Sequence, residues 1–198
     1  RTIEPTLDYS GRRAVAVVVE DRREQIVSGE RGPGAVGETP LAGARKSALT
    51  TAGGAPLAEV VRDALAAALE AKGFTAVVDG GEADYTWTLE ITDWWTARHK
   101  RTAHTYALFL TVRDAAGEVL AKPAVTGEVR FDAAGTIDDA GTVEDAGAVE
   151  DAGARAGAQS DADPVARVNA ALVSLLERLV ERLVNDPEVP RRMERFGG

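Results

Sequence analysis

Two hydrophobic patterns follow each other directly in residues 53–79, the first of helical period and the second typical of a strand. Between Pro56 and Gly73 the apolar residues form one stripe at helical spacing: Val60, Val61, Ala64, Leu65, Ala68 and Leu69. Pro56 suits the first turn of a helix, and Gly73 suits the left-handed residue after its last turn. Residues 74–79 are rich in β-branched side chains. The pattern predicts a helix that leads straight into a strand.

Strand patterns also lie before and after this unit. Residues 14–19 are almost continuously apolar, as in a strand that is covered on both faces. Residues 85–93 alternate, with Tyr85, Trp87, Leu89 and Ile91 on one face. Further strands are predicted at 104–113, 118–121 and 124–131, and short edge strands at 26–27 and 48–51 within a Gly-rich loop over 25–55.

A second helix is predicted near the C-terminus. Asp163 and Pro164 form a good helix start, and an apolar stripe runs from Val165 to Leu183. The resulting fold class is α+β. We expect a mixed sheet that begins with a right-handed strand–helix–strand unit and continues with antiparallel strands. Both helices should pack on one face of that sheet.

The acidity of the chain is concentrated in a repetitive segment. The formal net charge is −9, and residues 132–163 hold nine acids and one base, which accounts for −8. The repeat within residues 132–161 has few large apolar groups, so it predicts a flexible acidic Ala/Gly insert. A calcium-binding tract is the alternative, but the segment lacks the ligand spacing of an EF-hand loop. The domain is therefore expected to comprise residues 1–131 and 162–190, followed by a polar tail over 191–198.

Composition and motifs narrow the chemistry. The chain has no cysteine, no apolar run as long as a membrane-spanning helix, and an acidic balance that argues against nucleic-acid binding. The glycines of the loop have the wrong spacing for a phosphate-binding motif. The two histidines, His99 and His104, have no acidic partner in a ligand pattern. We therefore predict no catalytic residues, no metal site and no cofactor, and we expect that the protein is not an enzyme.

Two groups of residues have the chemistry of a binding surface. The first is Trp94 and Trp95 with the basic residues that follow, of which Arg98 comes first. Adjacent strand residues point to opposite faces, so at most one tryptophan lies in the core and the other can serve as a contact residue. The alternative is that Trp95 packs under the long loop.

The second group consists of Asp21, Arg22 and Arg23 at the end of the first strand. Charged residues at this place can contact a ligand that the long loop covers. The alternative is a solvated strand end with local ion pairs.

The order of short motifs resembles that of the YajG-type bacterial lipoproteins. The resemblance lies in residues 14–23, the Gly-rich loop, Pro56 and Leu57, residues 71–74, Ala83 and Asp84 before a strand, and the terminal helix with Asn185 and Asp186 after it. It implies an exported, periplasmic protein that is anchored to the membrane through a lipidated cysteine. No cysteine is present, so that anchor would lie upstream of Arg1.

These observations give one main hypothesis and two alternatives. The main hypothesis is a non-catalytic envelope lipoprotein domain that binds a protein partner or another envelope component. The first alternative is a hydrolase-like small-molecule enzyme that uses the loop over 24–55 as a lid above Asp21 and Arg23. The second is a homo-oligomer formed through the sheet edge or the terminal helix.

Overall fold

The computed structural model describes residues 13–40, 46–78, 81–98, 102–131, 137–138 and 164–189. The first half contains β1 (Ala14–Asp21), α1 (Glu24–Val27), β2 (Ala35–Pro40), β3 (Lys46–Thr50), the 3-10 turn η1 (Ala52–Gly54), α2 (Leu57–Ala71) and β4 (Thr75–Val77). The second half contains β5 (Tyr85–Arg98), β6 (Thr102–Asp114), β7 (Val119–Ala121), β8 (Ala124–Phe131), β9 (Ile137–Asp138) and α3 (Pro164–Val184).

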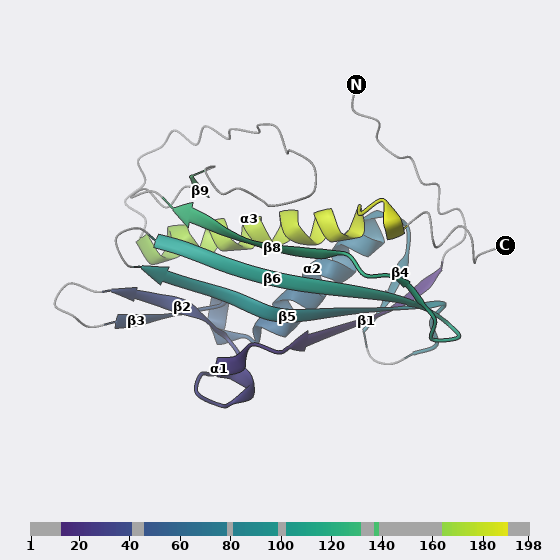
Figure 1. The fold of residues 1–198 in the computed structure, drawn as a ribbon, viewed down its shortest axis with the longest axis horizontal. Coiled ribbons are helices and arrows are strands. Elements are labelled where there is room, and N and C mark those ends of the chain that lie inside the picture. The colour runs from purple at the N-terminus through teal and green to yellow at the C-terminus, as the bar shows by residue number, and fades with distance from the viewer. Residues whose placement is uncertain are drawn as a thin grey trace, which may run out of the picture.

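The described strands form one mixed, curled sheet (Figure 1). Strand β1 pairs in parallel with β4 on one side and with β5 on the other, as the predicted strand–helix–strand unit requires. Strands β5, β6, β8 and β9 then continue the sheet in antiparallel order. The α+β prediction is confirmed, and so is the change from parallel to antiparallel pairing.

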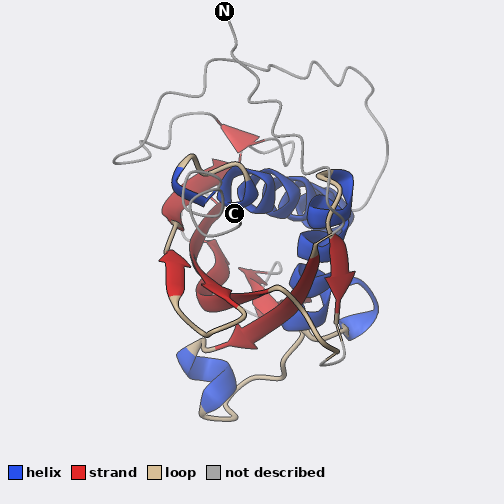
Figure 2. Cartoon of the chain, turned by 90° about the vertical axis from the view of Figure 1, so that its right-hand side faces the viewer, coloured by secondary structure: helices blue, strands red, loops and turns tan. Residues whose placement is uncertain are grey.

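Both long helices cover the same face of the sheet (Figure 2). Helix α2 packs on β1 and β4, while α3 contacts α2 and β8. Of the helical stripe seen in the sequence, Val61, Leu65 and Leu69 are buried and the other three members are partly buried; Leu57 adds a fourth buried residue. Gly73 has a φ of +88° after the last turn, which confirms its predicted left-handed conformation. The opposite face of the sheet is free of α2 and α3.

One edge of β5 is shared by two separate strands. Strand β6 lies along one side of β5, so β1 and β2 both lie along the other. Strand β1 pairs with residues 85–91, and β2 pairs with Thr96 further on. Between them the chain leaves the sheet as α1 and the turn after it (Figure 1).

The Gly-rich segment differs from its predicted form. Residues 26–27 lie in α1, so the predicted edge strand there is wrong: the main-chain N–H of Val27 bonds to the oxygen of Arg23 in a helical turn. The strand predicted at 48–51 exists as β3. Its partner β2 was missed because Gly37 and Pro40 lower the strand propensity of that segment.

Parts of the predicted acidic insert and the tail over 191–198 lie outside the described residues. Within the insert, Ile137 and Asp138 form β9 and pair with Phe131 and Arg130 of β8. The division into a domain, an insert and a tail stays a prediction.

Candidate functional site

A bulge in β5 decides where the tryptophan pair points. Up to Ile91 the odd-numbered residues of β5 are buried, and the pairing with β6 then shifts between Ile91 and Asp93. The extra residue, Thr92, reverses the alternation. Trp94 consequently turns into the core, where it is 2% exposed, and Trp95 turns to the face that α2 and α3 leave uncovered, where it is half-buried.

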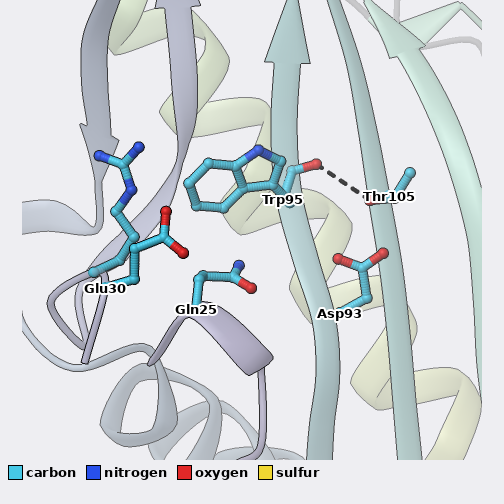
Figure 3. A pocket seen from close by; sticks show the side chains of 6 residues that line it. Gln25, Glu30, Asp93, Trp95 and Thr105 are labelled. Carbon is cyan, nitrogen blue, oxygen red and sulfur yellow. Dashed lines mark hydrogen bonds between the residues drawn. The ribbon is translucent and has the colours of Figure 1, made fainter. Parts of the chain in front are cut away.

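Trp95 forms one wall of a hollow of about 330 Å³ on this face. The hollow, called the Trp95 hollow below, is lined by Gln25, Glu30, Arg31, Asp93, Trp95 and Thr105. Gln25 comes from α1, and Glu30 and Arg31 come from the turn that follows. The segment between β1 and β2, residues 22–34, is called the α1 excursion below. It faces the strands across the hollow (Figure 3). The side chains thus come from the segment between β1 and β2 and from both strands of the β5–β6 hairpin.

The position of the excursion depends on Arg23, whose side chain is fully buried. Its Nε and Nη2 donate to the two carboxylate oxygens of Asp21 at 2.8 and 2.6 Å. Its Nη1 donates to the main-chain oxygens of Ala35 and of Trp94, the latter at 3.3 Å, and Nη2 also donates to Pro33 O at 3.2 Å. The five N–H groups of the guanidinium thereby join β1, the start of β2 and the bulged part of β5.

A buried histidine lies next to this network. His104 is fully buried on β6, with its Nδ1 2.9 Å from the hydroxyl of Thr96 and its ring against that of Trp94 at 4.5 Å. Burial, aided by the positive charge of Arg23, lowers the pKa of His104 from 6.5 to about 3. The imidazole is therefore neutral at ordinary pH and belongs to the core.

The predicted site residues divide into buried and exposed ones. Arg23 and Trp94 are buried, so the prediction that they contact a partner directly needs correction. Both side chains lie beneath the surface that carries Trp95. Asp21, whose side chain is 10% exposed, is engaged by Arg23. Arg22 is exposed and pairs with Glu20 at 2.5 Å and with Glu90 at 3.6 Å. This matches the alternative of local ion pairs at a strand end.

Trp95 is half-buried, and its role as a contact residue stays a prediction, while the side chain of Arg98 lies outside the described part of the structure. The other members of the Trp95 hollow were not predicted from the sequence. A signal for Asp93 and Thr105 existed in the β5–β6 hairpin, where pairing places Trp95 opposite Thr105. Nothing in the Gly-rich segment marked Gln25, Glu30 or Arg31.

The geometry also bears on the enzyme alternative. Residues 24–55 contain α1, η1 and the paired strands β2 and β3, of which β2 joins the main sheet, and Arg23 is covered on all sides. The two residues proposed for a lidded site are thus bound to each other. Within the described ranges, no three metal-ligating side chains come together. No described helix has the length and apolar character needed to cross a membrane.

Comparison with known proteins supports the fold. No protein-family model and no curated protein matches the sequence. A Xanthomonas campestris protein of family DUF330 has a similar structure, with a TM-score of 0.55 and 13% identity over 92% of this chain and 87% of that one. An uncharacterised protein is similar with a TM-score of 0.50 and 14% identity over 88% of this chain and 93% of that one.

A lipoprotein from Neisseria meningitidis also matches part of the chain. It has a TM-score of 0.38 and 9% identity over 60% of this chain and 83% of that one. Lipoproteins and uncharacterised proteins are therefore among the structural neighbours. The two structures with TM-scores of 0.55 and 0.50 show a shared arrangement of helices and strands.

Proposed function

We propose that this chain is the periplasmic domain of an envelope lipoprotein that binds a protein partner and catalyses no reaction. The orientation of Trp95 carries the binding part of the proposal. The bulge in β5 turns a large aromatic side chain out of the core and onto the sheet face that α2 and α3 leave uncovered. Tryptophan is enriched among the residues that dominate protein interfaces.

The surroundings of Trp95 support the same role. The Trp95 hollow presents carboxylate, guanidinium, amide and hydroxyl groups around one aromatic ring. A few polar groups beside an apolar anchor are typical of binding surfaces. The buried ionisable groups Arg23 and His104 are used for packing, so the described part of the chain offers binding chemistry mainly at its surface.

The envelope location is inferred from the resemblance to YajG-type lipoproteins, with the anchor upstream of Arg1. Metabolic labelling of the full-length precursor with an alkyne fatty acid tests it. We expect the label on the protein in the membrane fraction. An unlabelled protein would contradict the anchored form and leave the binding role to be tested separately.

Photo-crosslinking in the living organism tests the binding role. A benzophenone amino acid at Glu30, on the rim of the Trp95 hollow, is compared with one at Glu70, which is exposed on α2. We expect an adduct from position 30 that disappears with Trp95→Ala, and no adduct from position 70. Equal adducts from both positions, or none, would contradict the proposal. An adduct of twice the protein's own mass would identify a second copy as the partner.

A further inference from the structure

The Trp95 hollow is an open depression lined by side chains from the α1 excursion, β5 and β6. Its volume of about 330 Å³ lies at the lower end of the range for ligand pockets, roughly 300–1,000 Å³. Trp95 and Asp93 belong to β5, while Glu30 lies across from them on the α1 excursion (Figure 3), and Arg31 follows Glu30 in the lining. Arg23 donates hydrogen bonds to Pro33 and Ala35 at the end of the excursion and to Trp94 of β5, so its guanidinium joins the two walls.

The charges that line the hollow do not balance. Arg31 forms an ion pair with Glu38, so its charge is already matched from outside the hollow. Glu30 and Asp93 have no ion pair with any base in the described part of the structure. The hollow therefore carries two carboxylates whose natural complement is a positive charge.

The aromatic wall points to the same kind of ligand. The indole of Trp95 lies between these carboxylates, with Glu30 on one side and Asp93 on the other (Figure 3). Tryptophan has the most favourable ring face for a cation, and nearby carboxylates add direct pairing. A neutral ligand without hydrogen-bond donors would use the ring and leave both carboxylates without a partner.

We propose that the Trp95 hollow takes a cationic side chain, arginine above all, from a basic segment of the protein partner. The inference rests on the proposed binding function and specifies its chemistry. The guanidinium is planar, stacks on aromatic faces and donates two parallel hydrogen bonds to a carboxylate. One arginine can thus stack on Trp95 while it pairs with Asp93 or Glu30.

The test uses an end-blocked tetrapeptide with two central arginines and its analogue in which citrulline replaces arginine. Citrulline keeps the shape and planarity and removes the charge. Binding to the 198-residue chain is measured by calorimetry at low ionic strength. We expect the arginine peptide to bind about tenfold more tightly, as for hydrogen bonds to charged groups. Trp95→Ala should weaken it about two- to fivefold, and Trp95→Phe less, because a ring face remains.

The charge variants make the test specific to the hollow. Asp93→Asn should weaken the arginine peptide severalfold and leave the citrulline peptide unchanged. Asp63→Asn removes an exposed carboxylate on α2 and should change neither. Circular dichroism of each variant confirms that the fold is kept.

Three outcomes would overturn the inference. They are equal binding of the two peptides, binding that does not depend on Trp95 or Asp93, and preferential binding of a glycan such as diacetylchitobiose. In all three cases the crosslinking experiment at Glu30 still decides the proposed function. If the crosslinking experiment failed while the arginine peptide bound tightly, the result would contradict the proposal of a protein partner. The proposed cation site would still stand.

Discussion

Arg23 donates from Nη1 to the main-chain oxygen of Trp94 at 3.3 Å, which ties the end of β1 to the bulged part of β5. This bond links the two irregularities of the sheet. At one, β1 gives way to β2 along the edge of β5, and at the other Thr92 reverses the alternation of β5. Near this junction the main-chain oxygens of Pro33, Ala35 and Trp94 accept hydrogen bonds from this one buried guanidinium.

Removing this guanidinium should destabilise the protein strongly. Arg23→Met leaves the carboxylate of Asp21 without its partner and the three main-chain oxygens without this donor. We expect a loss of about 3–5 kcal/mol in the free energy of unfolding, which is typical when one member of a buried pair is removed. Arg23→Lys should also destabilise, by at least ~1 kcal/mol, because an ammonium cannot reproduce the planar fork. Denaturant unfolding measures both.

The control for this prediction is an exposed pair on the same sheet. Arg130 pairs with Glu128 at 3.0 Å, and their side chains are 54% and 46% exposed. Arg130→Met should cost less than ~1 kcal/mol. If Arg23→Met were as mild as Arg130→Met, the buried network would not hold the junction.

The contact between β2 and β5 should not tolerate a side chain at Gly37. A Cβ at this position would clash with the main-chain oxygen and the Cβ of Thr96. Gly37→Ala is therefore expected to destabilise by about 1–3 kcal/mol, as overpacking does. Gly32→Ala is the matched control, because a Cβ there meets nothing within 4 Å. Equal thermal stability of the two variants would show that β2 does not lie this close to β5.

Acid should destabilise the fold through His104. The pKa of His104 is lowered to about 3 in the folded protein, while in the unfolded chain it is near 6.5. The unfolded state therefore binds the proton first. Stability from this group is complete above about pH 6.5 and is lost as the pH falls toward 3, at up to ~1.4 kcal/mol per pH unit.

A substitution isolates the contribution of His104 from those of the carboxylates. In His104→Gln, which retains a partner for Thr96, the slope of unfolding free energy against pH between 6 and 4 should be smaller by about 1 kcal/mol per unit. Unchanged slopes in wild type and variant would mean that water reaches His104.

Deleting the repetitive insert should leave the domain folded. Removal of residues 133–158 also removes β9, which pairs with the end of β8. Because only two residues of pairing are lost, we expect a melting temperature close to that of the intact chain. A deletion of 141–158, which spares β9, serves as the comparison. Collapse of both variants would show that the repeat is structural.

The regular part of the fold was predictable from the sequence because its signals are local and repeated. The stripe of α2 and the left-handed Gly73 identify a helix and its end. The alternation that starts at Tyr85 identifies a half-buried strand, although β5 runs on past the predicted end at Asp93. These features follow from neighbours in the chain.

The candidate site was not predictable in the same way. Continuing the alternation of β5 would place Trp95 in the core, and only the pairing of β5 with β6 reveals the bulge at Thr92. Likewise, Arg23 looked like an exposed strand-end charge. It is buried because β2, for which the sequence carries a weak signal, returns to cover it. Both depend on contacts between distant segments.

Acrylamide quenching of tryptophan fluorescence tests the central structural claim most directly. The chain has three tryptophans, and Trp87 and Trp94 are 1% and 2% exposed. Trp95 should therefore account for nearly all quencher-accessible emission. We predict strong quenching in wild type, almost none in Trp95→Phe, and no change with Trp94→Phe. Strong quenching that survives in Trp95→Phe would contradict the outward orientation of Trp95, on which both proposals depend.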